Sequence, residues 1–167
     1  MMSKGISKTV KSASTVEPAN VARYFMFRAF QDGELVSPLK MQKLIYYAYV
    51  WVLVHNNTKL FKESIEAWPN GPVVPSLYHK LKTYGASPID ESFLEGISYD
   101  DLVKSFSPEV LETLSEVYEA YMTKTAFELV VMTHAERPWA EARKGLGTTE
   151  HSDAPITDES IVSYYVA

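Results

Sequence analysis

The 167-residue sequence contains no cysteine, which excludes disulfide bonds and leaves histidine, aspartate and glutamate as the side chains able to build a metal site. The absence of cysteine also favours a reducing, cytoplasmic setting. The four histidines are far apart, and none has a second ligand three or four residues away on a convincing site face. We therefore expect no metal and no cofactor.

Long hydrophobic runs are also missing. The longest, residues 44–54, has 11 residues, whereas a membrane-spanning helix needs roughly 18 to 20. Residues 1–16 carry three lysines but no apolar core of a signal peptide. We expect a soluble protein with no membrane partner, in which residues 1–16 form a flexible leader and residues 17–167 form one domain.

The common catalytic and nucleotide-binding motifs are absent: there is no G-x-G-x-x-G, phosphate-binding loop, H-E-x-x-H or G-x-S-x-G. His134 with Glu136 or Glu141 could carry out acid–base chemistry. A histidine that ends an apolar helix is, however, more often a cap or a core hydrogen-bonding group. The sequence therefore favours a protein that is not an enzyme, with a hydrolase using His134 and a carboxylate as the less favoured alternative.

Acidic side chains are scarce in the first half of the chain and abundant in the second. Residues 1–16 and 17–85 each carry a net charge of +3, whereas residues 86–167 carry −11. The acidic half is either ordinary solvated surface or a face for a basic partner. Nucleic acid is an unlikely ligand because an acidic face repels phosphates, although the leader with Lys40, Lys43, Lys80 and Lys82 offers a basic alternative.

The apolar pattern predicts a mainly α fold: a compact, single-domain helical bundle around a central apolar helix at about 38–55. Ser37-Pro38 is a typical helix start, and the stretch from Leu44 onward is apolar on nearly every face. Lys40 and Lys43 are expected at the solvent-facing start of this helix. Lys43 either serves solubility or reaches across to an acidic group.

Capping residues and apolar spacing predict the remaining elements. Helices are expected at 21–30, 75–85, 107–121, 125–134, 138–144 and 157–165, a long loop at 86–99, and at most a short strand or hairpin near 60–75.

Residues 69–72, Pro-Asn-Gly-Pro, form a dense turn signal in which the prolines fix φ and Asn or Gly supplies left-handed backbone angles. We call residues 66–85, which contain this turn, the Gly-Pro corner. It is either a structural corner that packs Trp68 and two tyrosines into the core, or a rigid recognition surface. We favour a core position for Trp68 and a partner-facing position for the turn tip.

Three stretches together resemble one family: PLKMQKLIYYAYVW at 38–51, IEAWPNGPVVPSLYHKLKTYG at 65–85 and THAERPWAEAR at 133–143. The family is the Panacea domain of SocA-like antitoxins from bacterial and phage toxin–antitoxin systems. The segment ITDESIVSYY at 156–165 is similar to the end of that domain, so the resemblance covers about residues 20–167. Pro69 departs from the family, which more often has a non-proline residue there.

The resemblance implies a helical domain that neutralises a toxin encoded beside it, through protein contact and not through catalysis. It indicates a cytoplasmic, prophage-associated antitoxin whose partner is the cognate protein toxin. The alternative is an adaptor that delivers the toxin to an ATP-dependent protease. We predict partner-binding roles for Lys43, Tyr47, Glu66, Asn70, Gly71, Pro72, Tyr78, His79 and His134, and structural roles for Trp51, Trp68, Pro75, Tyr84, Pro138, Trp139 and Arg143.

Overall fold

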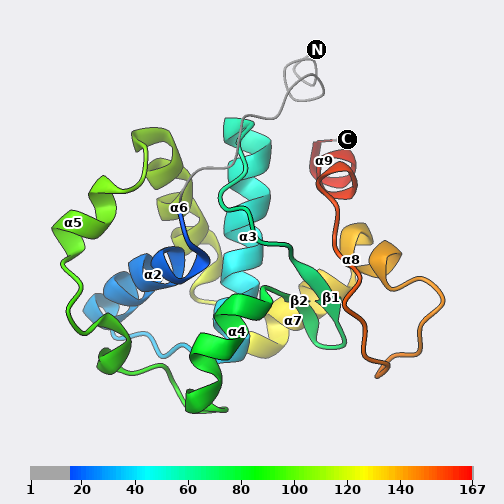
Figure 1. The fold of residues 1–167 in the computed structure, drawn as a ribbon, viewed down its shortest axis with the longest axis horizontal. Helices are drawn as coiled ribbons and strands as arrows, with labels where there is room; N and C mark the ends of the chain where they lie inside the picture. The colour runs from blue at the N-terminus through cyan, green and yellow to red at the C-terminus, as the bar shows by residue number, and fades with distance from the viewer. Residues whose placement is uncertain (1–15, 167) are drawn as a thin grey trace.

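Helix α3 (Pro38–Asn56) runs through the centre of the computed structural model, which describes residues 16–166 (Figure 1). The Ser37 side chain accepts a hydrogen bond from the Lys40 backbone N–H, and Pro38 occupies the first helical turn. Every residue from Lys40 to Leu53 is buried except Trp51. The predicted central apolar helix and the mainly helical fold class are confirmed.

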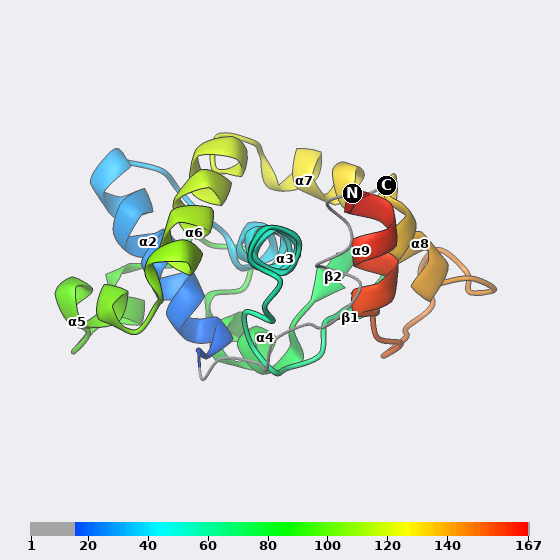
Figure 2. The ribbon, with the colours of Figure 1, turned by 90° about the horizontal axis from the view of Figure 1, so that it is seen from above.

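The other helices surround α3 on several sides, as the view along its axis shows (Figure 2). Helices α2 and α6 lie on one side and α9 on the opposite side, while α4 and α7 flank the remaining two faces. The elements besides α3 are α2 (Pro18–Asp32), β1 (Glu66–Trp68), β2 (Gly71–Val73), α4 (Pro75–Leu81), α5 (Tyr99–Lys104), α6 (Pro108–Tyr121), α7 (Ala126–His134), α8 (Arg137–Ala142) and α9 (Asp158–Val166), with short 3₁₀ helices η1 (Lys82–Tyr84) and η2 (Glu91–Leu94).

The capping signals of α6 and α7 act as the sequence predicts. The Ser107 side chain accepts the Val110 N–H, and Pro108 follows it at the first helical position. At α7, Thr125 and Glu128 form the complete reciprocal capping box. These local bonds fix where the two helices begin.

The segment predicted as a long loop at 86–99 contains η2 and leads directly into α5, a helix that was not predicted. Ser98 caps α5 by accepting the Asp101 N–H, and two aspartates occupy its first turn, where they favour the positive end of the helix dipole. The helix has only six residues, so it lacks the repeated apolar spacing on which the prediction relied.

A hairpin of β1 and β2 is the only sheet within residues 16–166, and it confirms the short hairpin expected near 60–75. Trp68 pairs with Gly71 and Glu66 with Val73 in an antiparallel register. Two such short strands are marginal alone. The hairpin gains support from the segment before α9, since the Ala67 N–H donates to the Ala154 carbonyl at 2.9 Å and the Ile156 N–H donates to the Ile65 carbonyl at 2.8 Å.

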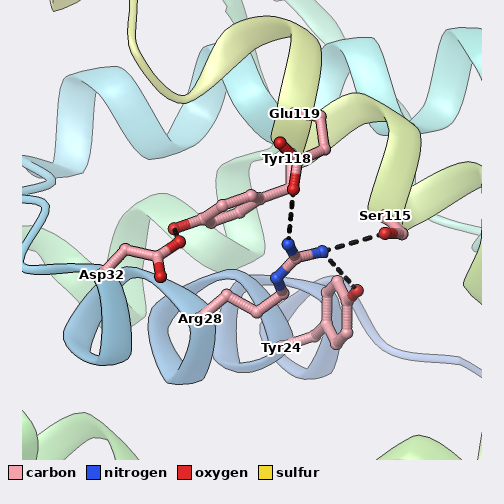
Figure 3. A network of polar contacts seen from close by, with 6 residues as sticks. All are labelled: Tyr24, Arg28, Asp32, Ser115, Tyr118 and Glu119. Atoms are coloured by element: carbon pink, nitrogen blue, oxygen red, sulfur yellow. Dashed lines mark hydrogen bonds and ion pairs between the residues drawn. The ribbon is translucent and has the colours of Figure 1, made fainter.

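Arg28 joins α2 to α6 (Figure 3). Its guanidinium donates to the Tyr24 hydroxyl, to Ser115 Oγ at 3.0 Å and to the Glu119 carboxylate at 2.7 Å. The same group lies 4.1 Å from the ring centre of Tyr118, whose hydroxyl donates to Asp32. This network fixes the side of the bundle away from the hairpin. No helix within residues 16–166 is long and apolar enough to cross a membrane.

Candidate partner-binding site

Lys43 lies beneath the hairpin, and its side chain is completely buried. Its Nζ donates to the Pro72 carbonyl at 2.9 Å, and burial lowers its pKa to about 7. The prediction that Lys43 faces solvent or reaches an acidic group is therefore wrong, because its partner is a backbone carbonyl. Lys40 is also buried, with Nζ 2.5 Å from the Met122 carbonyl at the end of α6, where a cation suits the helix dipole.

Gly71 and Pro72 rest on this lysine and do not face solvent. Gly71 has φ +115°, and a Cβ at this position would lie 2.6 Å from Lys43 Cε and 3.0 Å from Thr133 Oγ1. Both Gly71 and Pro72 are buried, and only Asn70 at the turn is exposed. The expected partner-facing role of the turn tip thus applies to Asn70 alone.

Gln42 closes the free edge of β2, a role that sequence reasoning missed. Its Oε1 accepts the Val74 N–H at 2.9 Å, and its Nε2 donates to the Val74 carbonyl at 3.3 Å. The side-chain amide therefore replaces a neighbouring strand. The signal was present only as a polar residue within an otherwise apolar helix.

Tyr47 belongs to a buried polar network centred on Glu136. The Tyr47 hydroxyl lies 3.0 Å from both carboxylate oxygens of Glu136, and the Tyr165 hydroxyl donates to the same carboxylate. Burial raises the pKa of Glu136, and the two tyrosine hydrogen bonds oppose that rise. Tyr47 has no exposed surface in this structure, so its burial lends no support to the predicted contact with a partner.

The network continues from Tyr47 to α6. The Tyr47 ring stacks on Tyr121 with centroids 4.3 Å apart, and the Tyr121 hydroxyl accepts the Trp51 Nε1–H at 2.8 Å. The resulting chain of contacts links α3, α6 and α9 across the bundle.

His134 ends α7 and stacks on Trp139, with ring centroids 3.9 Å apart. Burial lowers its pKa, and the positive charge of Lys43 acts in the same direction. The two carboxylates considered as its catalytic partners are engaged elsewhere: Glu136 by the tyrosines, and Glu141 by Arg137 at 3.4 Å. The histidine therefore sits in a packing contact.

Trp139 and Arg143 hold the hairpin from α8. Trp139 Nε1 donates to the Trp68 carbonyl at 2.8 Å. The buried Arg143 guanidinium donates to three carbonyls, those of Ala67, Gly147 and Glu150. Strand β1 of the hairpin is thus fixed by two side chains from the C-terminal half.

The Trp68 side chain lies at the surface of the hairpin and not within the core. Its Nε1 donates to Glu66 at 2.9 Å, and its ring meets the Tyr78 ring at 5.0 Å. The indole is half-buried, and Tyr78 is 40% exposed. Trp68, for which we favoured a core position, thus forms a surface pair with Tyr78, which we predicted to contact a partner.

A groove of about 350 Å³ opens beside this aromatic pair. It lies between the start of α3, the hairpin turn and α4, and we call it the α3–α4 groove. Its lining is Pro38, Leu39, Gln42, Trp68, Pro69, Asn70, Val73, Tyr78, Leu81, Lys82 and Gly85. Small-molecule pockets of similar size are commonly lined in this way, with apolar walls and few polar groups.

The predicted partner-binding residues fall into three groups. Asn70, Tyr78 and His79 are exposed, Glu66 and His134 are half-buried, and Lys43, Tyr47, Gly71 and Pro72 are buried. Of these, Asn70 and Tyr78 line the α3–α4 groove. Among the remaining residues assigned structural roles, Pro75 begins α4, the Tyr84 hydroxyl meets Ser92 at 2.8 Å, and Pro138 is buried in α8.

Exposed apolar side chains flank the start of α3 on two faces, one beside α4 and one beside α7. Within residues 16–166 six large ones are exposed, and the sixth, Tyr99, lies on α5. Leu39 and Tyr78 line the α3–α4 groove, and Leu35 shares a second pocket with Ala126, next to Phe127. Leu35 and Phe127 are each 75% exposed and Val131 is 49% exposed. We call Leu35, Leu39, Tyr78, Phe127 and Val131 the apolar surface; sequence reasoning identified only Tyr78.

Three comparisons relate the chain to known proteins. A family model described as "Antitoxin SocA-like, Panacea domain" matches residues 41–140. The chain is also similar to "Antitoxin SocA" of Caulobacter vibrioides (strain NA1000 / CB15N), with 28% identity over 152 residues that cover 88% of this chain and 81% of the relative. No solved structure matches it. Within residues 16–166, no group of three or more His, Asp or Glu side chains is placed to hold a metal ion.

Proposed function

The chain belongs to the family of SocA-like antitoxins with a Panacea domain, and from this premise we propose that it neutralises a co-encoded protein toxin by binding it directly. The family supports an antitoxin role and favours a non-enzymatic one. The cognate toxin is the protein partner that this role requires.

The observation that carries direct binding is the apolar surface. Five of the six large exposed apolar side chains within residues 16–166 belong to it: Leu39 and Tyr78 line the α3–α4 groove, and Leu35, Phe127 and Val131 lie before α3 and on α7. Scattered exposed apolar residues are ordinary, whereas a concentration of them is typical of a protein–protein interaction site. Leucine and aromatic side chains in such a place lose contact with water when a partner covers them.

The hydrogen bonds that hold the hairpin beside the groove support the same function. Lys43, Gln42 and Arg143 each donate to a hairpin carbonyl or its flank, so the turn and Trp68 are held before any partner arrives. A rigid binding surface loses less conformational freedom on association and therefore binds more tightly for the same contacts.

Co-expression with the neighbouring gene tests the proposal. We expect that gene product to arrest growth alone, to be tolerated with the wild-type chain, and to co-purify with it. Phe127→Ser should weaken co-purification, because it removes an exposed ring from the apolar surface. Tyr99→Ala is the matched control, since Tyr99 is the exposed aromatic outside that surface. Rescue of growth without any complex would contradict direct binding.

Toxin half-life separates masking from delivery to a protease. Masking predicts that co-expression leaves the half-life of the toxin the same in wild-type and protease-deficient cells. A toxin that becomes long-lived only in the protease-deficient cells would assign the chain to the adaptor class. His134→Gln separates both from a hydrolase, because a binding protein keeps its neutralising activity after that change.

A further inference from the structure

We infer that the α3–α4 groove receives a large apolar side chain of the toxin. The residue before or after it in the toxin sequence is an aspartate or glutamate. The inference rests on the proposed function and specifies which segment of the toxin the chain recognises. Three observations carry it: the shape of the groove, its walls and the distribution of charge around it.

The groove has the size and walls of a socket for a side chain. Its volume, about 350 Å³, is at the small end of the range for ligand pockets, so it fits one or two side chains and not a helix. Leu39, Val73 and Leu81 supply aliphatic surface, and Trp68 and Tyr78 supply two rings that meet at an interplanar angle of 61°. Anchor side chains in protein interfaces commonly fill pockets of this kind.

The walls are fixed independently of any partner. Trp68 is held by Glu66 through its indole N–H and by Trp139 through its carbonyl. Gln42 binds Val74 on the floor side through two hydrogen bonds. Because these contacts exist without a ligand, the socket does not have to be ordered when the toxin binds.

Charge around the groove is positive in a chain that is acidic overall. Every residue that lines it comes from residues 35–62 or 67–89, and neither segment contains an aspartate or glutamate. Lys82, the first residue of η1, is the charged side chain in the groove lining. The carboxylate of the adjoining strand, Glu66, accepts the Trp68 indole N–H.

This distribution selects an acidic neighbour for the anchoring side chain. A carboxylate on the toxin segment gains from Lys82 and meets no opposing carboxylate in the groove lining. A basic segment would instead be drawn to the carboxylates of residues 86–167, which carry a net charge of −11. The groove therefore favours an acidic and apolar segment over a basic one.

Binding of the purified neighbour-encoded protein to the full chain tests this inference. Tyr78→Ala and Leu39→Ala should each raise Kd by about 30-fold or more, as expected for an anchoring pocket. Lys82→Glu should raise Kd by roughly three- to tenfold and reduce its dependence on salt between about 50 and about 300 mM. Lys80→Glu is the matched control, because Lys80 is exposed on the preceding helix α4 and does not line the groove, and it should change Kd by less than about twofold.

The outcomes separate this inference from the proposed function. If the wild-type chain binds and neutralises the protein but neither Tyr78→Ala nor Lys82→Glu weakens binding, the groove assignment is overturned and direct binding stands. If the wild-type chain does not bind, both fail. Lys82→Glu changes an exposed side chain, so it remains informative even if Tyr78→Ala unfolds the domain.

Other occupants give different results. A Tyr78→Ala change that converts a dimer to a monomer would assign the groove to a second copy of the chain. A gain in toxin affinity after deletion of residues 1–15 would assign it to that segment. Retention of a single-stranded oligonucleotide that Tyr78→Ala abolishes would assign it to nucleic acid. Each of these would overturn the inference.

Discussion

Substitution of Gly71 by alanine should destabilise the domain far more than the loss of one glycine usually does. Two costs add at this position. The first is backbone strain, about 1–2 kcal/mol, because an L residue disfavours φ +115°. The second is steric, because the new Cβ would lie 2.6 Å from Lys43 Cε.

Relief of that contact requires Lys43 to move away from the Pro72 carbonyl. The lysine is buried, and a buried polar group that loses its hydrogen bond costs about 1–3 kcal/mol. We therefore expect Gly71→Ala to lower the free energy of unfolding by about 2–5 kcal/mol. That is a large part of the roughly 5–15 kcal/mol that stabilises a typical domain.

Urea unfolding followed by circular dichroism measures this loss, with the midpoint falling at an unchanged slope. Gly33→Ala is the matched control, because Gly33 also has a positive φ, +75°, but a Cβ there meets no atom within 4 Å. It should cost only the backbone term, about 1–2 kcal/mol. Equal losses for the two variants would refute the steric argument.

A double-mutant cycle sharpens the test. In a Lys43→Ala background the nearest obstacle to the new Cβ is absent and Thr133 Oγ1, at 3.0 Å, remains, so Gly71→Ala should cost less than in the wild-type chain and close to the backbone strain of about 1–2 kcal/mol. The coupling between Gly71 and Lys43 is then the difference between the two losses. If the loss is the same in both backgrounds, Lys43 is not the obstacle.

Three further outcomes follow from contacts within the bundle. Lys43→Met should flatten the dependence of stability on pH between about 7.5 and 9.5. Because the pKa of Lys43 is lowered in the folded chain, the unfolded chain binds one more proton in this range, so the stability of the wild-type chain rises with pH. Urea titrations should show a rise of at most about 1.4 kcal/mol per pH unit. Thr125→Ala should lower the free energy of unfolding by about 0.5–2 kcal/mol, because α7 loses its capping bond, and an unchanged urea midpoint would contradict this. Tyr165→Phe should cost about 1–3 kcal/mol by removing a donor to Glu136, whereas Tyr164→Phe, which keeps its ring over Arg137, should be nearly neutral in the same assay.

Local signals in the sequence were sufficient to place most helices. Ser37-Pro38, Ser107-Pro108 and the capping box at Thr125 each begin a helix where expected, because a cap is satisfied by bonds within one turn. The hairpin was also foreseeable, since its turn residues are adjacent in the chain.

The burial and the hydrogen-bond partners of individual polar side chains could not be predicted in the same way. Lys40 and Lys43 occupy the first turns of a helix, where lysine is usually solvated, yet both are buried. Their acceptors, the carbonyls of Met122 and Pro72, lie 82 and 29 residues away along the chain. No spacing rule within the helix reveals a partner at such a distance.

Some residues of the candidate site could likewise be predicted from the sequence, and others could not. Tyr78 and Asn70 could be selected because the motif that holds them is compact and unusual. Leu39 and Phe127 lie within predicted apolar helices and Leu35 in the connection before one of them, and nothing in the sequence distinguishes them as exposed. A surface composed of residues from three separate elements has no periodic signal of its own.

The hairpin depends on contacts with residues that are synthesised much later than its own strands. Its strands leave the ribosome about 70 to 90 residues before Trp139, Arg143 and Ala154, which bind it directly. A nascent chain that ends in α6 therefore has its central helix but lacks the contacts that fix one wall of the α3–α4 groove. Premature termination or proteolytic loss of the last few dozen residues would therefore leave a helical remnant whose groove lacks one fixed wall.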